Sequence, residues 1–178
     1  MEDCEYNIDG KEFFPGVVGI NNLGKTDYAT SVFYLFNAIK EIRTYFLTNN
    51  DFEDELVSQF SLLLKKIWNP LNFKGIVSPH EFLQYISDRS GKKFKIGSQS
   101  DPTTFMLWMM DALTKGIKKQ YKKKYFDVSS LVRGSLKTSV IRVGKESNEY
   151  EDMPSKVQET PFLILKLQFP EKGIFNKR

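Results

Sequence analysis

Sulfur and imidazole groups are almost absent from this sequence. Its 178 residues include one cysteine, Cys4, and one histidine, His80. A single thiol excludes an internal disulfide, a CxxC redox site and a zinc site built on paired cysteines. Any pairing of a histidine with a nucleophile inside this chain would have to use His80. We therefore expect no cofactor and no bound metal, and we interpret Cys4 as an incidental exposed thiol.

Long hydrophobic runs are missing as well. The longest, such as FSLLL at residues 60–64, fall far short of the roughly 20 apolar residues that a helix needs to cross a bilayer. The first residues are acidic and lack the apolar stretch of a secretory signal. We expect an intracellular protein that makes no membrane contact.

Neither sign of charge dominates the composition. The chain has 26 Lys and Arg against 22 Asp and Glu, a formal net charge of +4. Hydrophobic residues make up 40% of it and 15 residues are Phe, which predicts a globular protein with a core rich in rings. The mild positive charge permits contact with nucleic acid or with an acidic protein surface, but it does not indicate either one.

The chain changes character near residue 125. Residues 1–14 read as a polar lead-in, and residues 15–125 as a helical lobe that opens on a short extended segment, FPGVVGINN. A helix then begins at Asp27, whose carboxylate we expect to be its N-cap. Apolar residues follow at helical spacing and predict its buried face. They are Val32, Leu35, Phe36 and Ile39.

Further helices follow in the same lobe. One is expected from about residue 52 to residue 68, with a buried face of Leu56, Phe60, Leu63, Leu64 and Ile67. In SPHEFLQYIS, Ser78 is expected as N-cap and Glu81 as its capping-box partner. In SDPTTFMLWMM, Asp101 caps and Pro102 opens a helix. Its stripe is Phe105, Trp108, Met109, Ala112 and Leu113. Aromatic residues at core spacing are Phe33, Tyr34, Phe36, Tyr45, Phe46 and Trp68.

Residues 126–178 follow a β pattern. We expect a strand in VSSLVRGSLKTSVIRV, then a charged loop, then a strand in TPFLILKLQFP, where Leu163, Leu165 and Leu167 alternate with other side chains. The fold class is therefore α+β, with helices first and strands last. A pair of strands cannot bury both of its faces alone. We expect an incomplete domain whose strand FLILKLQF offers an open edge for dimerisation.

The stretch NNLGKTDY is the candidate site. A thiol at a helix N-terminus is activated by the helix dipole, and an upstream asparagine can donate to an oxyanion. Here Asp27 stands at the expected helix start, where the thiol would be, and Asn22 lies upstream. A carboxylate cannot replace a thiolate in the same attack on an amide. Asp27 is therefore interpreted as a helix-capping residue rather than a catalytic one.

Several segments resemble landmarks of the ubiquitin-specific proteases. GVVGINNLGKTDYATSVFYLF is similar to their cysteine box, usually G-L-x-N-L-G-N-T-C-Y-x-N-S, with Asp27 at the position of the nucleophilic cysteine. QSDPTTFM is similar to their Q-Q-D-A-x-E-F landmark, with Thr104 at the Glu position. The β segments resemble the start of the family's fingers without its zinc cysteines, near whose positions stand Val140 and Val143. Matching residues are Gly19, Asn22, Leu23, Gly24, Thr26, Tyr28, Ser31, Gln99, Asp101, Phe105, Gly134 and Pro170.

Within that family the closer resemblance is to the splicing-factor branch of the spliceosomal tri-snRNP, in which the nucleophile is also aspartate. The run WNPLNFKGIVSPHE is specific to this branch, and the resemblance as a whole extends from about Tyr6 to Pro170. It implies a papain-like cysteine-protease fold: a helical thumb in residues 15–125 and the first strands of fingers and palm in residues 126–178. It also implies no peptidase activity, a nuclear location and a role in pre-mRNA splicing. The family's histidine and Asp/Asn boxes would follow Arg178.

Three functions stay open from the sequence. The first is a catalytically silent scaffold that contacts tri-snRNP proteins and keeps Asn22 and Asp27 as vestigial site positions. The second is a working deubiquitinase, against which Asp27 argues. The third is a pseudoenzyme that binds ubiquitin weakly without cleaving it.

A basic run offers a separate contact site. Lysines crowd the expected end of a helix, where the dipole favours cations. They include Lys118, Lys119, Lys122, Lys123 and Lys124. The simpler interpretation is a solvated helix end, and the functional one is an electrostatic contact with RNA phosphates or an acidic protein. His80, at the start of its helix, is interpreted as a surface or packing histidine.

Overall fold

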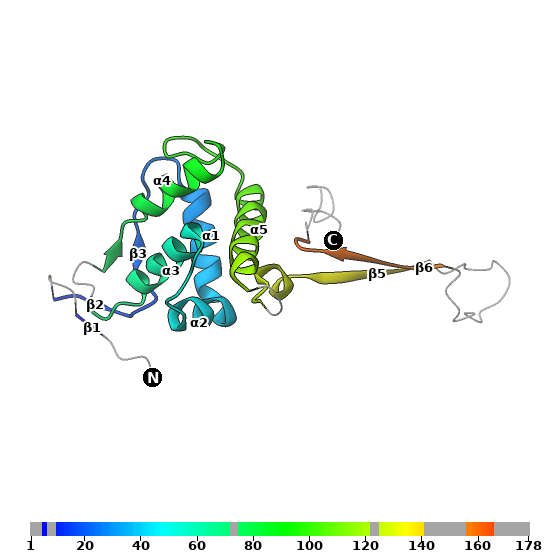
Figure 1. Cartoon of the computed structure of the whole chain (residues 1–178), viewed down its shortest axis with the longest axis horizontal. Helices are drawn as coiled ribbons and strands as arrows, with labels where there is room; N and C mark the ends of the chain where they lie inside the picture. The colour runs from blue at the N-terminus through cyan, green and yellow to red at the C-terminus, as the bar shows by residue number, and fades with distance from the viewer. Residues whose placement is uncertain (1–4, 7–9, 72–74, 122–124, 141–155, 166–178) are drawn as a thin grey trace, which may run out of the picture. The chain divides into compact units, whose positions relative to one another are not determined.

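The computed structural model describes residues 5–6, 10–71, 75–121, 125–140 and 156–165 of the chain (Figure 1). The chain divides into two compact units, Met1–Val128 and Ser129–Arg178. The first unit is mostly helical and the second contains a β-hairpin. The α+β class predicted from the sequence is therefore confirmed.

The helices of the first unit are α1 (Asp27–Ala38), α2 (Lys40–Thr48), α3 (Glu55–Ile67), α4 (His80–Arg89) and α5 (Pro102–Gln120). α1 packs against α2 and α5, while α3 packs against α2, α4 and α5 (Figure 1). The helix predicted over residues 52–68 is α3, which begins a few residues later than expected. All five residues predicted for its inner face are buried.

Very short strands tie the loops of this unit together. β1 (Glu5–Tyr6) pairs antiparallel with β2 (Glu12–Phe13). β3 (Gly19–Ile20) pairs in parallel with β4 (Ile76–Val77), with Gly19 opposite Ile76. β3 lies in the segment predicted to be extended. The β3–β4 pair joins the loop before α1 to the segment that leads into α4.

The core is built from phenylalanine rings, as the composition predicts. Phe33, Phe36, Phe46, Phe60 and Phe105 are fully buried. They meet largely edge to face; the centroids of Phe46 and Phe60, for example, lie 4.8 Å apart at 81°. Such edge-to-face pairs add about 0.5–1.5 kcal/mol beyond the burial of their area. This core fixes α1 against α3 and α5.

Some of the expected core residues are at the surface instead. Leu35 is 44% exposed and Tyr34 is 38% exposed. The hydroxyl of Tyr34 accepts from the Ile20 amide at 2.9 Å and donates to the Val18 carbonyl at 2.9 Å. Tyr34 therefore fastens β3 to α1 rather than filling the core. Tyr45, Trp68, Trp108 and Ala112 are half-buried.

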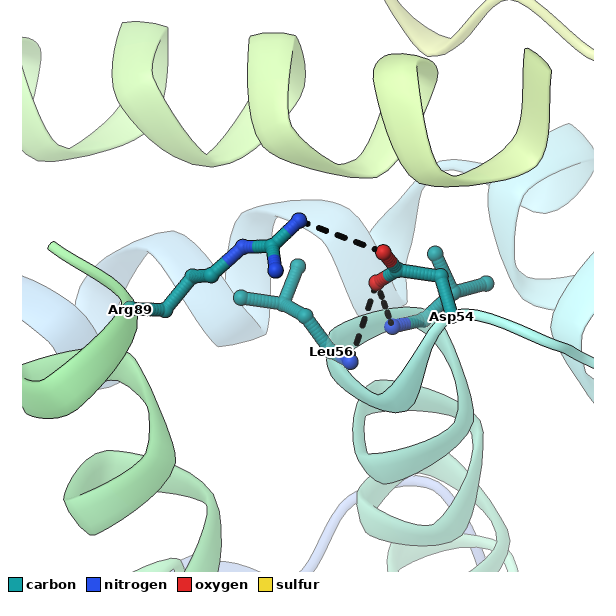
Figure 2. Close-up of polar contacts among 4 residues, drawn as sticks. Asp54, Leu56 and Arg89 are labelled. Atoms are coloured by element: carbon teal, nitrogen blue, oxygen red, sulfur yellow. Dashed lines mark hydrogen bonds and ion pairs between the residues drawn. The ribbon is translucent and has the colours of Figure 1, made fainter. Parts of the chain in front are cut away.

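α3 begins on a buried carboxylate (Figure 2). The Asp54 side chain accepts from the amides of Leu56 and Val57 at 3.1 and 3.4 Å, so it is the N-cap of α3. Its second oxygen accepts from the Arg89 guanidinium at 3.3 Å. Only 8% of the Asp54 side chain is exposed, against 50% for Arg89. One carboxylate therefore joins the start of α3 to the end of α4.

The predicted cap of α4 is wrong. The structure places Pro79 at the N-cap position, and no side chain caps this helix. The Pro79 carbonyl accepts from Leu83 at 2.9 Å, so the helix begins one residue later than the capping box requires. Glu81 instead pairs with Lys66 of α3 at 3.1 Å. The predicted cap of α5 is confirmed, because Asp101 accepts from the Thr104 amide at 2.7 Å.

The second unit contains η1 (Val128–Leu131 at the boundary), β5 (Gly134–Val140) and β6 (Lys156–Phe162). β5 and β6 pair antiparallel from Gly134 opposite Phe162 to Val140 opposite Lys156. The prediction that the second strand runs through Leu163 and Leu165 is wrong, because β6 ends at Phe162, opposite the first residue of β5. Residues 166–170 of that predicted strand, Leu167 included, lie outside the described residues.

Candidate functional site

The loop before α1 is shaped by the side chain of Asn22. Its Oδ1 accepts from the Gly24 amide at 3.1 Å, from the Thr26 amide at 3.1 Å and from the Thr26 hydroxyl at 2.9 Å. The Leu23 amide donates to Thr26 Oγ1 at 3.0 Å. The side-chain oxygen of Asn22 therefore accepts hydrogen bonds within the loop. Its side-chain nitrogen is the group that could donate to an oxyanion.

Asp27 is the first residue of α1 rather than its N-cap, so the predicted capping role is wrong. The N-cap position belongs to the buried Thr26, whose carbonyl accepts from Ala29 and Thr30 at 3.1 and 3.0 Å. The Thr26 hydroxyl donates to Asn22 rather than accepting from an amide of the helix, and no side chain caps α1. The Asp27 side chain is exposed and lies in the first turn, where the helix dipole favours a negative charge.

Gln99 is the partner of Asp27. Its Nε2 donates to Asp27 Oδ2 at 3.3 Å, and the neighbouring Gly97 amide donates to the Gly24 carbonyl at 2.9 Å. The loop after α4 therefore lies against the loop before α1. The sequence matched Gln99 to a family landmark but gave no sign of this contact, because the partners are 72 positions apart.

The residue after Asp27 anchors the site to the core. Tyr28 is 2% exposed, and its ring meets Phe105 edge to face with centroids 5.3 Å apart. Burial raises the pKa of Tyr28 above its ordinary value of 10.0, and the negative charge of Asp27 raises this pKa further. The exposed Asp27 is thus followed directly by a residue that is buried among aromatic rings of the core.

The other predicted site residues lie apart from this loop. Lys118 and Lys119 are exposed in the last turn of α5, and the Lys118 ammonium lies 5.5 Å from the Tyr125 ring centroid. Lys122, Lys123 and Lys124 lie outside the described residues, as does Cys4. His80 is exposed at the first position of α4, which agrees with its interpretation as a surface residue.

Backbone strain marks two lysines that the sequence did not single out. Lys25 and Lys92 have φ of 54° and 63° and are the positive-φ residues other than glycine in the described part of the chain. This left-handed conformation costs an L-residue with a Cβ about 1–2 kcal/mol. Glycine or asparagine is the usual sequence signal for it, and both positions carry lysine instead.

No group of three or more His, Cys, Asp or Glu side chains that could hold a metal ion occurs within the described ranges. Over those same ranges, no helix is long and apolar enough to cross a membrane.

Solved structures define the class of protein to which this arrangement belongs. A structure titled as a crystal structure of an essential yeast splicing factor matches with a TM-score of 0.70 and 26% identity, over 96% of this chain and 40% of that one. A chain of the SAGA DUB module bound to monoubiquitin matches with a TM-score of 0.54 and 15% identity, over 84% of this chain and 35% of that one. The second likeness shows the fold alone. The fold is that of the ubiquitin-specific proteases.

The sequence comparison gives the family. The profile of the family described as ubiquitin carboxyl-terminal hydrolase matches residues 18–173, and the chain belongs to this family. Human ubiquitin carboxyl-terminal hydrolase 39 is 34% identical over 161 residues, which are 85% of this chain and 28% of that protein. The probable mRNA-splicing protein ubp10 of Schizosaccharomyces pombe is 34% identical over 182 residues, or 96% of this chain and 36% of that protein. The chain thus spans about a third of the length of these relatives.

Proposed function

We propose that this chain is part of a non-catalytic, ubiquitin-specific-protease-like scaffold that acts in pre-mRNA splicing through protein–protein contacts within the tri-snRNP. The observation that carries the proposal is Asp27. It is the first residue of α1, and its carboxylate is hydrogen-bonded to Gln99. The resemblance of NNLGKTDY to the family's cysteine box assigns it the position of the nucleophilic cysteine. Relatives named as splicing proteins in two yeasts support the process, and a nuclear location follows from it.

The absence of peptidase activity follows from the chemistry of the groups at this position. A carboxylate at the start of α1 is stabilised by the helix dipole, but it lacks the nucleophilicity of a thiolate toward an amide. The vestigial site then consists of Asn22 and Asp27. Asn22 holds the loop through its oxygen, as the bonds to Gly24 and Thr26 show.

The test separates the scaffold from a deubiquitinase. The chain is incubated with a ubiquitin whose C-terminus carries an electrophile, and the same chain is used to capture proteins from nuclear extract for mass spectrometry. We expect recovery of tri-snRNP proteins and no covalent adduct. A covalent adduct would mean that another residue supplies a nucleophile. Non-covalent retention of ubiquitin, without tri-snRNP proteins, would favour a ubiquitin-binding pseudoenzyme.

Two further contacts belong to this proposal. Lys118 and Lys119, with the adjacent run of lysines at 122–124, are candidates for an electrostatic contact with RNA phosphates. The strand-rich C-terminal segment is a candidate for edge-to-edge dimerisation of the chain. Light scattering across a range of concentrations tests the second contact: a mass that stays monomeric at the highest concentration would contradict it.

A further inference from the structure

Four exposed lysines lie in the two loops that are hydrogen-bonded to each other at the vestigial site. Lys25 lies in the loop before α1, while Lys92, Lys93 and Lys95 lie in the loop after α4. The hydrogen bond from the Gly97 amide to the Gly24 carbonyl, 2.9 Å long, joins these loops. Both loops run along the upper edge of the first unit in Figure 1. We call these four residues the lysine surface.

The core beneath holds the lysine surface in place. The Lys93 ammonium lies 5.3 Å from the centroid of the Phe94 ring. Phe94 is 1% exposed and packs against Tyr28, with ring centroids 6.2 Å apart, and against Phe105 at 5.0 Å. Tyr28 follows Asp27 directly in the chain. The loop after α4 and the start of α1 therefore contribute rings to one aromatic cluster, through Phe94 and Tyr28. The hydrogen bond from Gln99 to Asp27 is a second connection between the same two segments.

The charges of the lysine surface are not neutralised within the part of the chain that the structure describes. The ion pairs formed there use Lys66, Arg89 and Lys115. Asp101, the acid of the later loop, accepts hydrogen bonds from the Thr104 amide and hydroxyl as the cap of α5. A cluster of cations without internal partners is suited to an external anion.

Strain in the backbone gives an independent sign of function. Lys25 and Lys92, one in each loop, are the two residues with left-handed φ that are not glycine over the described ranges. Glycine or asparagine would adopt this conformation more easily than lysine. Side chains held in a disfavoured backbone conformation occur preferentially at functional sites. The charge of lysine is the property that glycine and asparagine would not supply.

We propose that the lysine surface is a docking site for an extended, Asp/Glu-rich segment of a partner protein. A protein segment fits better than RNA for two reasons. Phe94 and Tyr28, the rings that support the surface, are 1% and 2% exposed and offer no face for base stacking. The exposed carboxylate of Asp27, two positions after Lys25 at the start of α1, also repels anions. A peptide can place an uncharged residue opposite it, whereas a nucleic-acid backbone carries a charge at every nucleotide. This proposal rests on the proposed scaffold function and names the chemical class of one partner segment, a run of acidic residues.

The test measures binding of a short, fluorescein-labelled Asp/Glu-rich peptide to the full chain by fluorescence anisotropy. The variant is Lys25→Asn with Lys92→Asn, which removes two charges and also relieves two strained positions. We expect the peptide to bind about tenfold more weakly, as the loss of close charge contacts produces, while the melting temperature stays equal or rises. Weaker binding together with unchanged or higher stability cannot come from misfolding.

The matched control is Lys40→Gln with Lys115→Gln, which removes the same charge from two exposed positions, one in α2 and one in α5. We expect less than about a twofold change in peptide affinity, since exposed charges farther apart than a Debye length are screened. Single-stranded RNA of matched length is the competing probe.

Three results would overturn the proposal: no binding of the peptide to the unaltered chain, equal losses in the two double variants, or a preference for RNA that is lost in the Lys25/Lys92 variant. The assay contains no extract and no ubiquitin. Failure here therefore leaves the splicing proposal standing, and an adduct with the ubiquitin probe leaves the peptide result standing.

Discussion

At the scale of single residues, Gly16 and Gly24 illustrate two reasons why a position requires glycine: a left-handed backbone, and a lack of space for a Cβ. Both have left-handed backbones, with φ of 86° and 90°. A Cβ on Gly16 would lie 2.3 Å from the Trp68 ring, whereas one on Gly24 would meet nothing within 4 Å. The Gly16 amide also donates a hydrogen bond to the Ile67 carbonyl, and Asn37 Nδ2 donates one to the Gly16 carbonyl, each at 2.9 Å.

Substituting alanine at these two glycines should therefore have unequal effects. Gly24→Ala should lower the free energy of unfolding by about 1–2 kcal/mol, the cost of left-handed backbone alone. Gly16→Ala adds a clash with a ring that the Asn37 side chain holds by a 2.7 Å bond from Trp68 Nε1, so a further 1–3 kcal/mol or so is expected. Urea unfolding followed by circular dichroism measures both. Equal losses would mean that Trp68 moves aside freely.

Tyr28 predicts a response to alkaline pH. Burial, and then the charge of Asp27, hold the pKa of Tyr28 above 10.0 in the folded chain. A raised pKa in the folded state contributes stability that is complete below the ordinary pKa and is lost as pH rises through the folded value. The free energy of unfolding should therefore fall above about pH 10.

Tyr28→Phe should show a smaller fall over that range, with little change near neutral pH. The fall should not vanish, because burial also raises the pKa of Tyr45 and Tyr85. Urea unfolding at a series of pH values tests this. An identical alkaline slope in the variant and the unaltered chain would show that Tyr28 does not contribute.

At the scale of elements, Asp54 joins three helices. It caps α3, binds Arg89 of α4, and lies under α5, where a Cβ on Gly116 would be 2.8 Å from Asp54 Cγ (Figure 2). Asp54→Ala should reduce the free energy of unfolding by about 1–3 kcal/mol, because it removes the cap and leaves two amides without their acceptor.

Asp54→Asn is the matched control. An amide oxygen can still accept from Leu56 and Val57, so only the contribution of the half-exposed ion pair should be lost, about 1 kcal/mol or less. Thermal unfolding of the two variants separates the cap from the ion pair. If Asp54→Asn destabilised the chain as much as Asp54→Ala, the charge rather than the cap would be the main contribution.

Helix caps also show what the sequence could and could not predict about the elements. Asp101 before Pro102 was a correct prediction, because Asp101 has the extended backbone of an N-cap and its carboxylate accepts from the Thr104 amide. Asp27 and Ser78 were wrong predictions because a neighbouring residue occupies the N-cap position in each case. Thr26, which precedes Asp27, is the N-cap of α1, and Pro79, which follows Ser78, is the N-cap of α4. Periodicity predicted the inner face of α3, but it could not show that Leu35 of α1 would be 44% exposed.

The candidate site was predictable in part for the same physical reason. A local motif such as NNLGKTDY places Asn22 and Asp27 at a helix start without further information. The contact of Asp27 with Gln99 and the joining of Gly24 to Gly97 depend on tertiary packing. Left-handed φ at Lys25 and Lys92 could not be anticipated, because lysine has no preference for it.

At the scale of the whole molecule, the two units differ in how their backbone is protected. The first has a ring-rich core with fully buried Phe33, Phe60 and Phe105. In the second, nearly every residue of β5 and β6 is exposed, and the hairpin is supported by cross-strand contacts such as Ser135 Oγ to Glu159 Oε1 at 2.8 Å. An isolated pair of strands is at best marginally stable in water.

Amide hydrogen exchange should therefore divide the chain at the boundary after Val128. In the isolated chain, amides of α1, α3 and α5 should exchange only through unfolding of the first unit, whereas those of β5 and β6 should exchange within a small factor of an open chain. The free energies of opening measured for β5 would be near zero, as expected for locally unfolding segments. Protection of β5 and β6 that grows with protein concentration would instead show that these strands acquire a partner, and edge-to-edge association of two copies would then be the first explanation to test.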